Sequence, residues 1–238
     1  MSENTIPQVW YFCIREMPIS LESLTAKQRY RVKKGLKKNN IRKIDWNDIE
    51  SRFDEFFDML VASFSDFPDV YRPTLDKENI RNNLKSACQS DNIDVWLCEE
   101  VETGKIIGYS WCSLVQNMVN LNVVKIDPAY LKNEVNAALG FVLCQYYLNE
   151  KKLKYICDGE RNIRHQSNYQ NFLVSVLGFR KAYCRLHIVY NPLVAPFVSL
   201  LYPLRNFLVR FKESNSLIYN IYCLLMQEQY ARESQKDS

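Results

Sequence analysis

The pattern of hydrophobic and polar positions changes character along the chain. Apolar residues recur every three or four positions over about 45–58 and 76–90, which predicts amphipathic helices there. Between residues 93 and 126, apolar runs separated by turn residues predict three successive antiparallel strands, over 93–100, 105–114 and 119–126. An aromatic run over 9–14 suits a buried strand. We therefore expect a mixed α/β fold that contains a β-meander.

After the meander, helical and strand-like periods alternate. A helix is expected from Glu134 to about Glu150, then a short buried strand over 153–157 and a helix over 166–177. Gly178 follows this helix, and glycine readily adopts the left-handed conformation of a helix C-terminus. The pattern over 179–190 predicts one long final strand. Beyond residue 192, helices with apolar faces are expected near 200–211 and 217–230, followed by a disordered tail over 234–238.

The charge is concentrated in one segment. Nine basic residues and no acidic residue lie between Lys27 and Lys43, whereas the net charge of the whole chain is only +4. This segment could bind phosphate groups, or it could be a helix whose charged face is simply solvated, as is common for charge runs. The acidic helix over 45–58 could also pair with it.

Composition narrows the class of protein. A chain of 238 residues that is 47% hydrophobic can bury a substantial core. Its eight cysteines form no C-x-x-C pair, and its two histidines show no metal-ligand spacing, so we expect reduced thiols and no metal site. The sequence shows no secretory signal pattern and no run as long as a membrane span. These features predict a cytoplasmic protein, with peripheral attachment to a membrane as an alternative.

The richest polar stretch covers residues 158–168, between the end of a strand and the next helix. Loops in this position often carry catalytic groups in α/β proteins. His165 is the natural general base, since an unperturbed histidine titrates near pH 6.5. Asp158 or Glu160 could orient it or hold a cationic substrate, and Glu99 is a reserve base. The alternative is that His165 is an ordinary surface residue.

Two motifs resemble the acyltransferases of the GNAT family. The run Val-Val-Lys-Ile-Asp-Pro-Ala-Tyr over 123–130 is similar to that family's fourth strand, which ends in a proline and an aromatic residue. The run Asn-Phe-Leu-Val-Ser-Val-Leu-Gly-Phe-Arg-Lys over 171–181 looks like the later helix and its Gly-Phe entry into the next strand. The resemblance implies a GNAT-like mixed, mainly antiparallel sheet flanked by helices over 46–190. Residues 1–45 would then be an N-terminal extension with a strand and a basic helix, and 191–238 a C-terminal helical extension.

The resemblance implies transfer of an acyl group, such as acetyl, from acetyl-CoA or another acyl-CoA to an amine or hydroxyl. The acceptor would be a small molecule or a glycan precursor. The strand and the following phosphate loop would supply the cofactor-binding residues Val124, Ile126, Lys132, Asn133, Asn136 and Ala137. Two positions depart from the family. Glu134 stands where a glycine is expected. Val174 stands where the family often has a tyrosine that protonates the leaving thiolate. Together these two departures indicate a different donor or no chemistry.

Two other functions remain open. The segment Lys-Gly-Leu-Lys-Lys over 34–38 resembles FemAB-type aminoacyl transferases, which implies aminoacyl-tRNA as donor with its phosphates on the basic segment between Lys27 and Lys43. Alternatively, the chain is a non-catalytic adaptor with a decayed donor site. It would dock to an anionic membrane or a protein through the basic segment and the helix near 200–211, unless that helix packs onto the domain.

Overall fold

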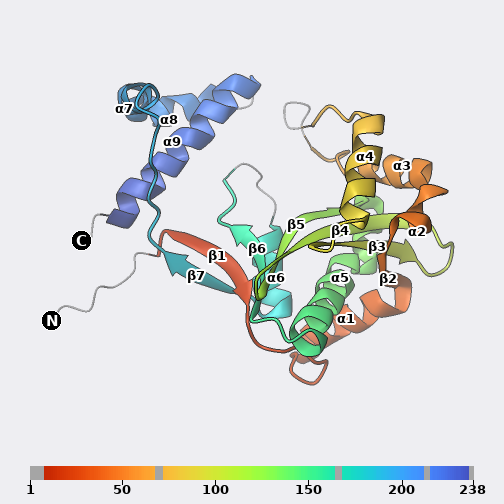
Figure 1. The fold of residues 1–238 in the computed structure, drawn as a ribbon. Helices are drawn as coiled ribbons and strands as arrows, with labels where there is room; N and C mark the ends of the chain where they lie inside the picture. Colours follow the sequence, from red (N-terminus) through yellow and green to blue (C-terminus); the bar gives the residue numbers. More distant parts are fainter. Residues whose placement is uncertain (1–7, 68–71, 164–167, 212–214, 236–238) are drawn as a thin grey trace.

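A seven-stranded sheet organises the chain, in a computed structural model that describes residues 8–67, 72–163, 168–211 and 215–235 (Figure 1). The strand order is β2-β3-β4-β5-β6-β1-β7, and every neighbouring pair is antiparallel except β5 and β6, which are parallel. The strands are β1 (Trp10–Arg15), β2 (Asn39–Ile44), β3 (Ile93–Glu100), β4 (Ile106–Val115), β5 (Met118–Ile126), β6 (Tyr155–Glu160) and β7 (Arg180–Cys184).

Helices cover both faces of this sheet (Figure 1). Those of the main body are α1 (Ala26–Lys38), α2 (Trp46–Glu50), α3 (Phe53–Ala62), α4 (Lys77–Cys88), α5 (Val135–Cys144) and α6 (Tyr169–Leu177). Short helical turns lie on either side of α5, namely η2 (Pro128–Asn133) and η3 (Gln145–Glu150). Helices α1, α5 and α6 share one buried cluster, which includes Val32, Leu139 and Leu173. Helices α2 to α4 form a second cluster on the other face, around Phe53 and Phe56.

The C-terminal helices project away from the sheet (Figure 1). They are α7 (Ala195–Leu201), α8 (Arg205–Leu208) and α9 (Ser216–Gln235), with the turns η4 (Tyr202–Leu204) and η5 (Val209–Phe211) flanking α8. Within the ranges that the structure describes, no helix combines the length and the apolar character needed to cross a membrane.

The meander and most helices agree with the sequence patterns, and side chains at helix ends explain several boundaries. Thr25 and Asp45 accept hydrogen bonds from the third residues of α1 and α2 in reciprocal capping boxes, and Asp76 caps α4. Gly178, at φ +66°, ends α6 as expected. The helix predicted over 45–58 is interrupted at residues 51–52 and becomes α2 and α3.

The N-terminal segment is part of the sheet. The strand expected over 9–14 is β1, which lies between β6 and β7, and the unexpected strand β2 pairs with β3 at the edge. Residues 1–45 therefore contribute two strands to the main sheet instead of forming an extension. The sequence pattern does not predict β2, because most of its residues are polar and it lies within the basic segment. Helices α3 and α1 lie on opposite faces of the sheet, so these acidic and basic helices do not pair. The acidic stretch still contacts the basic segment, because Asp48 of α2 forms an ion pair with Arg42 of β2 (3.0 Å).

Two predictions about the C-terminal region are also wrong. The final strand ends at Cys184 instead of continuing to residue 190, because the chain turns to α9. The backbone N–H of Leu186 donates to the Ser234 hydroxyl (3.2 Å), and the Tyr190 hydroxyl donates to Glu228 (2.8 Å). The disordered tail is expected to begin at residue 234. Helix α9 instead continues to Gln235, and Ser234 is buried in its last turn.

Candidate active site

An opening separates β5 from β6. The two strands pair over only three positions, from Met118 opposite Tyr155 to Asn120 opposite Cys157. Strand β5 continues to Ile126 without β6 as a neighbour. Two adjoining pockets of about 740 and 490 Å³ occupy this region, and they share Leu121, Asn122 and Asp158. The opening that parallel strands leave here is therefore hollow and accessible from two sides.

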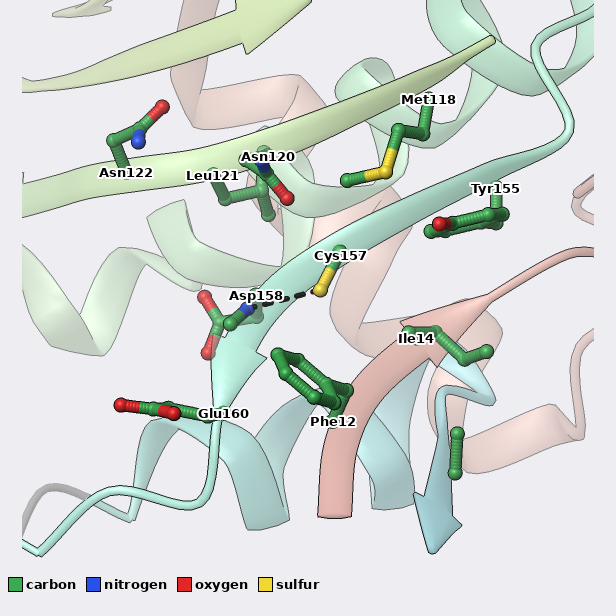
Figure 2. A pocket seen from close by; sticks show the side chains of 12 residues that line it. Phe12, Ile14, Met118, Asn120, Leu121, Asn122, Tyr155, Cys157, Asp158 and Glu160 are labelled. Atoms are coloured by element: carbon green, nitrogen blue, oxygen red, sulfur yellow. Dashed lines mark hydrogen bonds between the residues drawn. The ribbon is translucent and has the colours of Figure 1, made fainter. Parts of the chain in front are cut away.

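The larger pocket has apolar walls and a polar end (Figure 2). Phe12 and Ile14 of β1, Met118 of β5 and Tyr155 of β6 supply apolar or aromatic surface. The carboxylates of Asp158 and Glu160 lie at the same end of the pocket in Figure 2. Such a pocket fits a molecule with an apolar body and a cationic or hydroxyl group.

The smaller pocket extends from Asp158 toward the loop that follows β5. Its lining includes Asn136 from the start of α5 and Tyr169 from the start of α6. Lys125 also lines it, with its ammonium 4.0 Å from the ring centroid of Phe64. Burial lowers the pKa of Lys125, which is the expected effect of removing an ammonium from water.

Asp158 is the titratable group common to both pockets. Its side chain is half-buried, and this burial raises the pKa of its carboxyl group to about 7, although a hydrogen bond with Gln170 offsets part of the effect. A carboxyl group with this pKa exchanges its proton near neutral pH, which is the property that a general base requires.

Tyr169 lines the smaller pocket together with Asp158. The hydroxyl is buried and has no hydrogen-bond partner among the described residues, while the ring stacks on Phe172 at 6.0 Å between centroids. Burial and, secondarily, the negative charge of Asp158 raise the pKa of Tyr169 well above its ordinary value, so the phenol stays protonated. A buried donor without a partner is costly unless something in the pocket accepts its proton.

The six predicted cofactor-binding residues do not form one site. Val124, Ile126 and Asn136 line the smaller pocket. Lys132 and Asn133 line a separate pocket of about 420 Å³, together with Lys38, Glu100, Lys105 and Asp127. Ala137 is completely buried in the core. Half of the set is thus brought to the opening, and the other half is directed elsewhere because η2 turns the chain between them.

The loop residue Glu134 is held by helix α1. It adopts a left-handed conformation (φ 57°) between η2 and α5, and its carboxylate binds the Nε and Nη2 atoms of Arg31 at 2.9 and 2.8 Å. Helix α1 lies directly on the loop, because a Cβ atom on Gly35 would come within 2.5 Å of the Glu134 carbonyl oxygen. Asn39 also donates to the Asn133 carbonyl oxygen (3.1 Å). The acid at the expected glycine position is therefore neutralised by the basic segment.

The other predicted catalytic residues have different environments. His165 lies outside the described residues. Glu160 is exposed at the end of the larger pocket, and its backbone carbonyl accepts a hydrogen bond from Gln170 (2.9 Å). Glu99 is buried and paired with Arg42 (3.2 Å) and with Arg52, so it is committed to an ion-pair network and is unsuited to act as a base.

Sequence reasoning missed Tyr169 and Lys125. Tyr169 follows the polar stretch directly, but it does not stand at the family's acid position, which Val174 occupies. Lys125 lies in an apolar strand, where a lone lysine is unusual, and this was the available signal. Its aromatic neighbour Phe64 comes from the segment after α3, which sequence spacing does not connect to β5.

Comparisons with known proteins relate this chain to solved structures only. No family model matches the sequence, and no curated protein matches it. The structure of FemX superposes with a TM-score of 0.54 at 9% identity, over 77% of this chain and 61% of FemX. The chain thus spans less than two thirds of that relative.

Two further structures are similar at lower scores. The C-terminal domain of a putative lysylphosphatidylglycerol synthetase from Agrobacterium fabrum matches with a TM-score of 0.45 at 10% identity, over 63% of this chain and 46% of that chain. The acetyltransferase-like AAC(6')-Iy, solved with a CoA-linked bisubstrate analogue, matches with a TM-score of 0.45 at 13% identity, over 64% of this chain and 98% of that chain. The chain has a mixed α/β fold that is similar to that of FemX.

Proposed function

We propose that this protein transfers an acyl group to an amine or hydroxyl, with Asp158 as the general base. The observation that carries the proposal is the position of this carboxyl group. It lies where β5 and β6 separate, it is shared by two adjoining pockets, and its pKa is raised to about 7. A binding module has no need of a half-buried carboxyl group that titrates at neutral pH.

In this proposal, the two pockets bind different substrates. The acceptor binds in the larger pocket, with its neutral amine or hydroxyl group toward Asp158 and Glu160 and its apolar part against Phe12 and Tyr155. The acyl end of the donor enters the smaller pocket beside Tyr169. A small molecule or a glycan precursor that carries an amine or hydroxyl fits this acceptor site.

The reaction then needs two proton transfers. Asp158 takes a proton from the acceptor, whose nitrogen or oxygen attacks the donor carbonyl carbon and forms a new bond to it. When the intermediate collapses, the bond between that carbon and the leaving sulfur or oxygen breaks, and Tyr169 supplies a proton to the leaving group. Because burial raises the pKa of Tyr169, its phenol is protonated at neutral pH and carries the proton to be donated. Tyr169 thereby takes the role of the family's tyrosine, which Val174 replaces in this chain.

Acetyl-CoA or another acyl-CoA is the first candidate donor. Its phosphates would have to lie near a loop whose residue 134 is acidic, and the ion pair with Arg31 removes most of that electrostatic objection. However, the packing of α1 on this loop restricts access to it.

Aminoacyl-tRNA is the second candidate donor. Five lysines of α1 make no ion pair with an acid in the described part of the chain, namely Lys27, Lys33, Lys34, Lys37 and Lys38. All five lysines belong to α1, which lies beside the donor loop. A cationic helix there suits a polyanionic donor better than a diphosphate alone.

Donor binding tests the proposal. Calorimetry with acetyl-CoA should show saturable heat, and the Asp158→Asn variant should bind the donor equally well while losing acyl transfer to an amine acceptor. If acetyl-CoA gives no heat at millimolar concentration, charged tRNA becomes the donor to test, and its binding should weaken steeply as salt is raised. If neither donor binds, acyl transfer is refuted.

A further inference from the structure

The C-terminal helices carry a row of exposed apolar side chains. From the turn just before α7 through α7, η4, α8 and η5, these residues recur every three or four positions, so those in the helices lie on one side of the helical segment. Their exposed fractions range from 44% to 79%. We call this set the C-terminal apolar face, and it consists of Leu193, Phe197, Leu200, Leu204, Phe207 and Phe211.

The helices that carry the C-terminal apolar face are not isolated from the rest of the chain. The same segment already packs against α9 through its other side, where Val198 is only 3% exposed. Arg205 donates to Gln229 (3.3 Å), and the Arg232 guanidinium lies 3.9 Å from the Tyr202 ring centroid. In Figure 1 the helices α7, α8 and α9 stand beside one another, away from the sheet. The helical unit is therefore internally packed and still presents Leu and Phe side chains to water.

An exposed apolar row of this size is uncommon on a monomeric protein and marks an interaction surface. The charges around it distinguish the candidate partners. Residues 191–211 include Arg205 and Arg210 but contain no aspartate or glutamate, and Arg210 is exposed. A second copy of the chain would bring the same arginines to the contact without an acidic partner from this segment. An anionic surface complements both the apolar row and the exposed Arg210.

We propose that the C-terminal apolar face docks onto the surface of an anionic lipid bilayer. Leucine and phenylalanine side chains enter the boundary between headgroups and acyl chains, and Arg210 contacts anionic headgroups, as in interfacial amphipathic helices. The helices lie in the plane of the surface, since α7 and α8 are far too short to span it. This proposal does not depend on acyl transfer, because it concerns a surface separate from the opening between β5 and β6.

Vesicle flotation tests the proposal with the full chain. Vesicles of phosphatidylcholine alone are compared with vesicles that also contain phosphatidylglycerol. We expect the protein to float with the anionic vesicles and to bind them at least about tenfold more tightly than the neutral ones. The double variant Leu200→Glu/Phe207→Glu should lose this binding, and Arg210→Ala should weaken it by about fivefold.

Matched controls separate docking from misfolding and from self-association. Met17 is an apolar residue that is 70% exposed outside this region, so Met17→Glu should float like the wild type. All variants should keep the wild-type circular dichroism spectrum. Equal flotation of the double variant and the wild type would overturn the proposal, as would equal binding to neutral and anionic vesicles. A wild-type dimer that becomes monomeric in the double variant, without flotation of either, would assign the face to a second copy instead.

Discussion

Replacing Asp158 by asparagine should stabilise the protein at alkaline pH. Burial raises the pKa of this carboxyl group from 3.8 to about 7, so the unfolded chain ionises at lower pH than the folded one. Between these two values the unfolded state binds fewer protons, and the free energy of unfolding of the wild type therefore falls as pH rises. The limit of this loss above the folded pKa is about 4 kcal/mol, from roughly three pKa units at about 1.4 kcal/mol each.

The half-buried position of the side chain reduces that limit, because solvent screens part of the charge. We expect Asp158→Asn to gain about 2 kcal/mol over the wild type at about pH 8 and to lose this advantage at about pH 4. Urea unfolding followed by tryptophan fluorescence measures both values. Asp91→Asn, at an exposed turn residue before β3, serves as the control and should follow the wild type. Parallel stability curves for Asp158→Asn and the wild type between these pH values would refute the raised pKa and, with it, the argument for the base.

Three further substitutions test other parts of the reasoning. Gly35→Ala should lower the free energy of unfolding by about 1–3 kcal/mol, since its Cβ would clash with the donor loop, whereas Leu36→Ala on the exposed side of α1 should cost far less in the same urea assay. Tyr169→Phe should reduce acyl transfer at least about tenfold without loss of thermal stability, because the hydroxyl it removes makes no bond in the described structure; unchanged turnover would exclude the phenol as proton donor. Tyr147→Phe should destabilise by about 1–3 kcal/mol, since the buried Trp96 indole N–H would lose its acceptor at 3.0 Å, and an unaltered melting temperature would contradict this.

The sequence predicts the fold best where each element has a local signal. The meander over 93–126 has clear apolar runs and turn residues, and its strands differ from the predicted ones by a residue or two. Strand β2 could not be recognised, because it has the sequence Asn-Asn-Ile-Arg-Lys-Ile and is stabilised by pairing with β3. The early end of β7 likewise depends on a distant contact, the hydrogen bond from Leu186 to Ser234 in α9. Tertiary partners decide such segments against their local pattern.

The candidate site also combines features that have a local sequence signal with features that depend on tertiary contacts. Asp158 was predicted as a helper of His165 because it lies in a polar loop at a strand end, but its raised pKa depends on burial that only the folded chain supplies. From the loop sequence alone, the negative charge of Glu134 argues against binding of donor phosphates there. Its answer, the ion pair with Arg31, joins two residues that are about a hundred positions apart in the sequence, and no spacing rule connects them.

The place of β1 in the sheet has a consequence for how the protein folds. Phe12, in the first strand of the chain, pairs with Glu160 of β6 on one side and with Ala182 of β7 on the other. Pairings between such distant segments are slow to form, because a long loop must close before any contact compensates for the lost entropy. On the ribosome, β1 cannot join the sheet until β6 has emerged, and this side of the sheet is complete only when β7 follows. A nascent chain should therefore resist protease first over the meander and only later around β1.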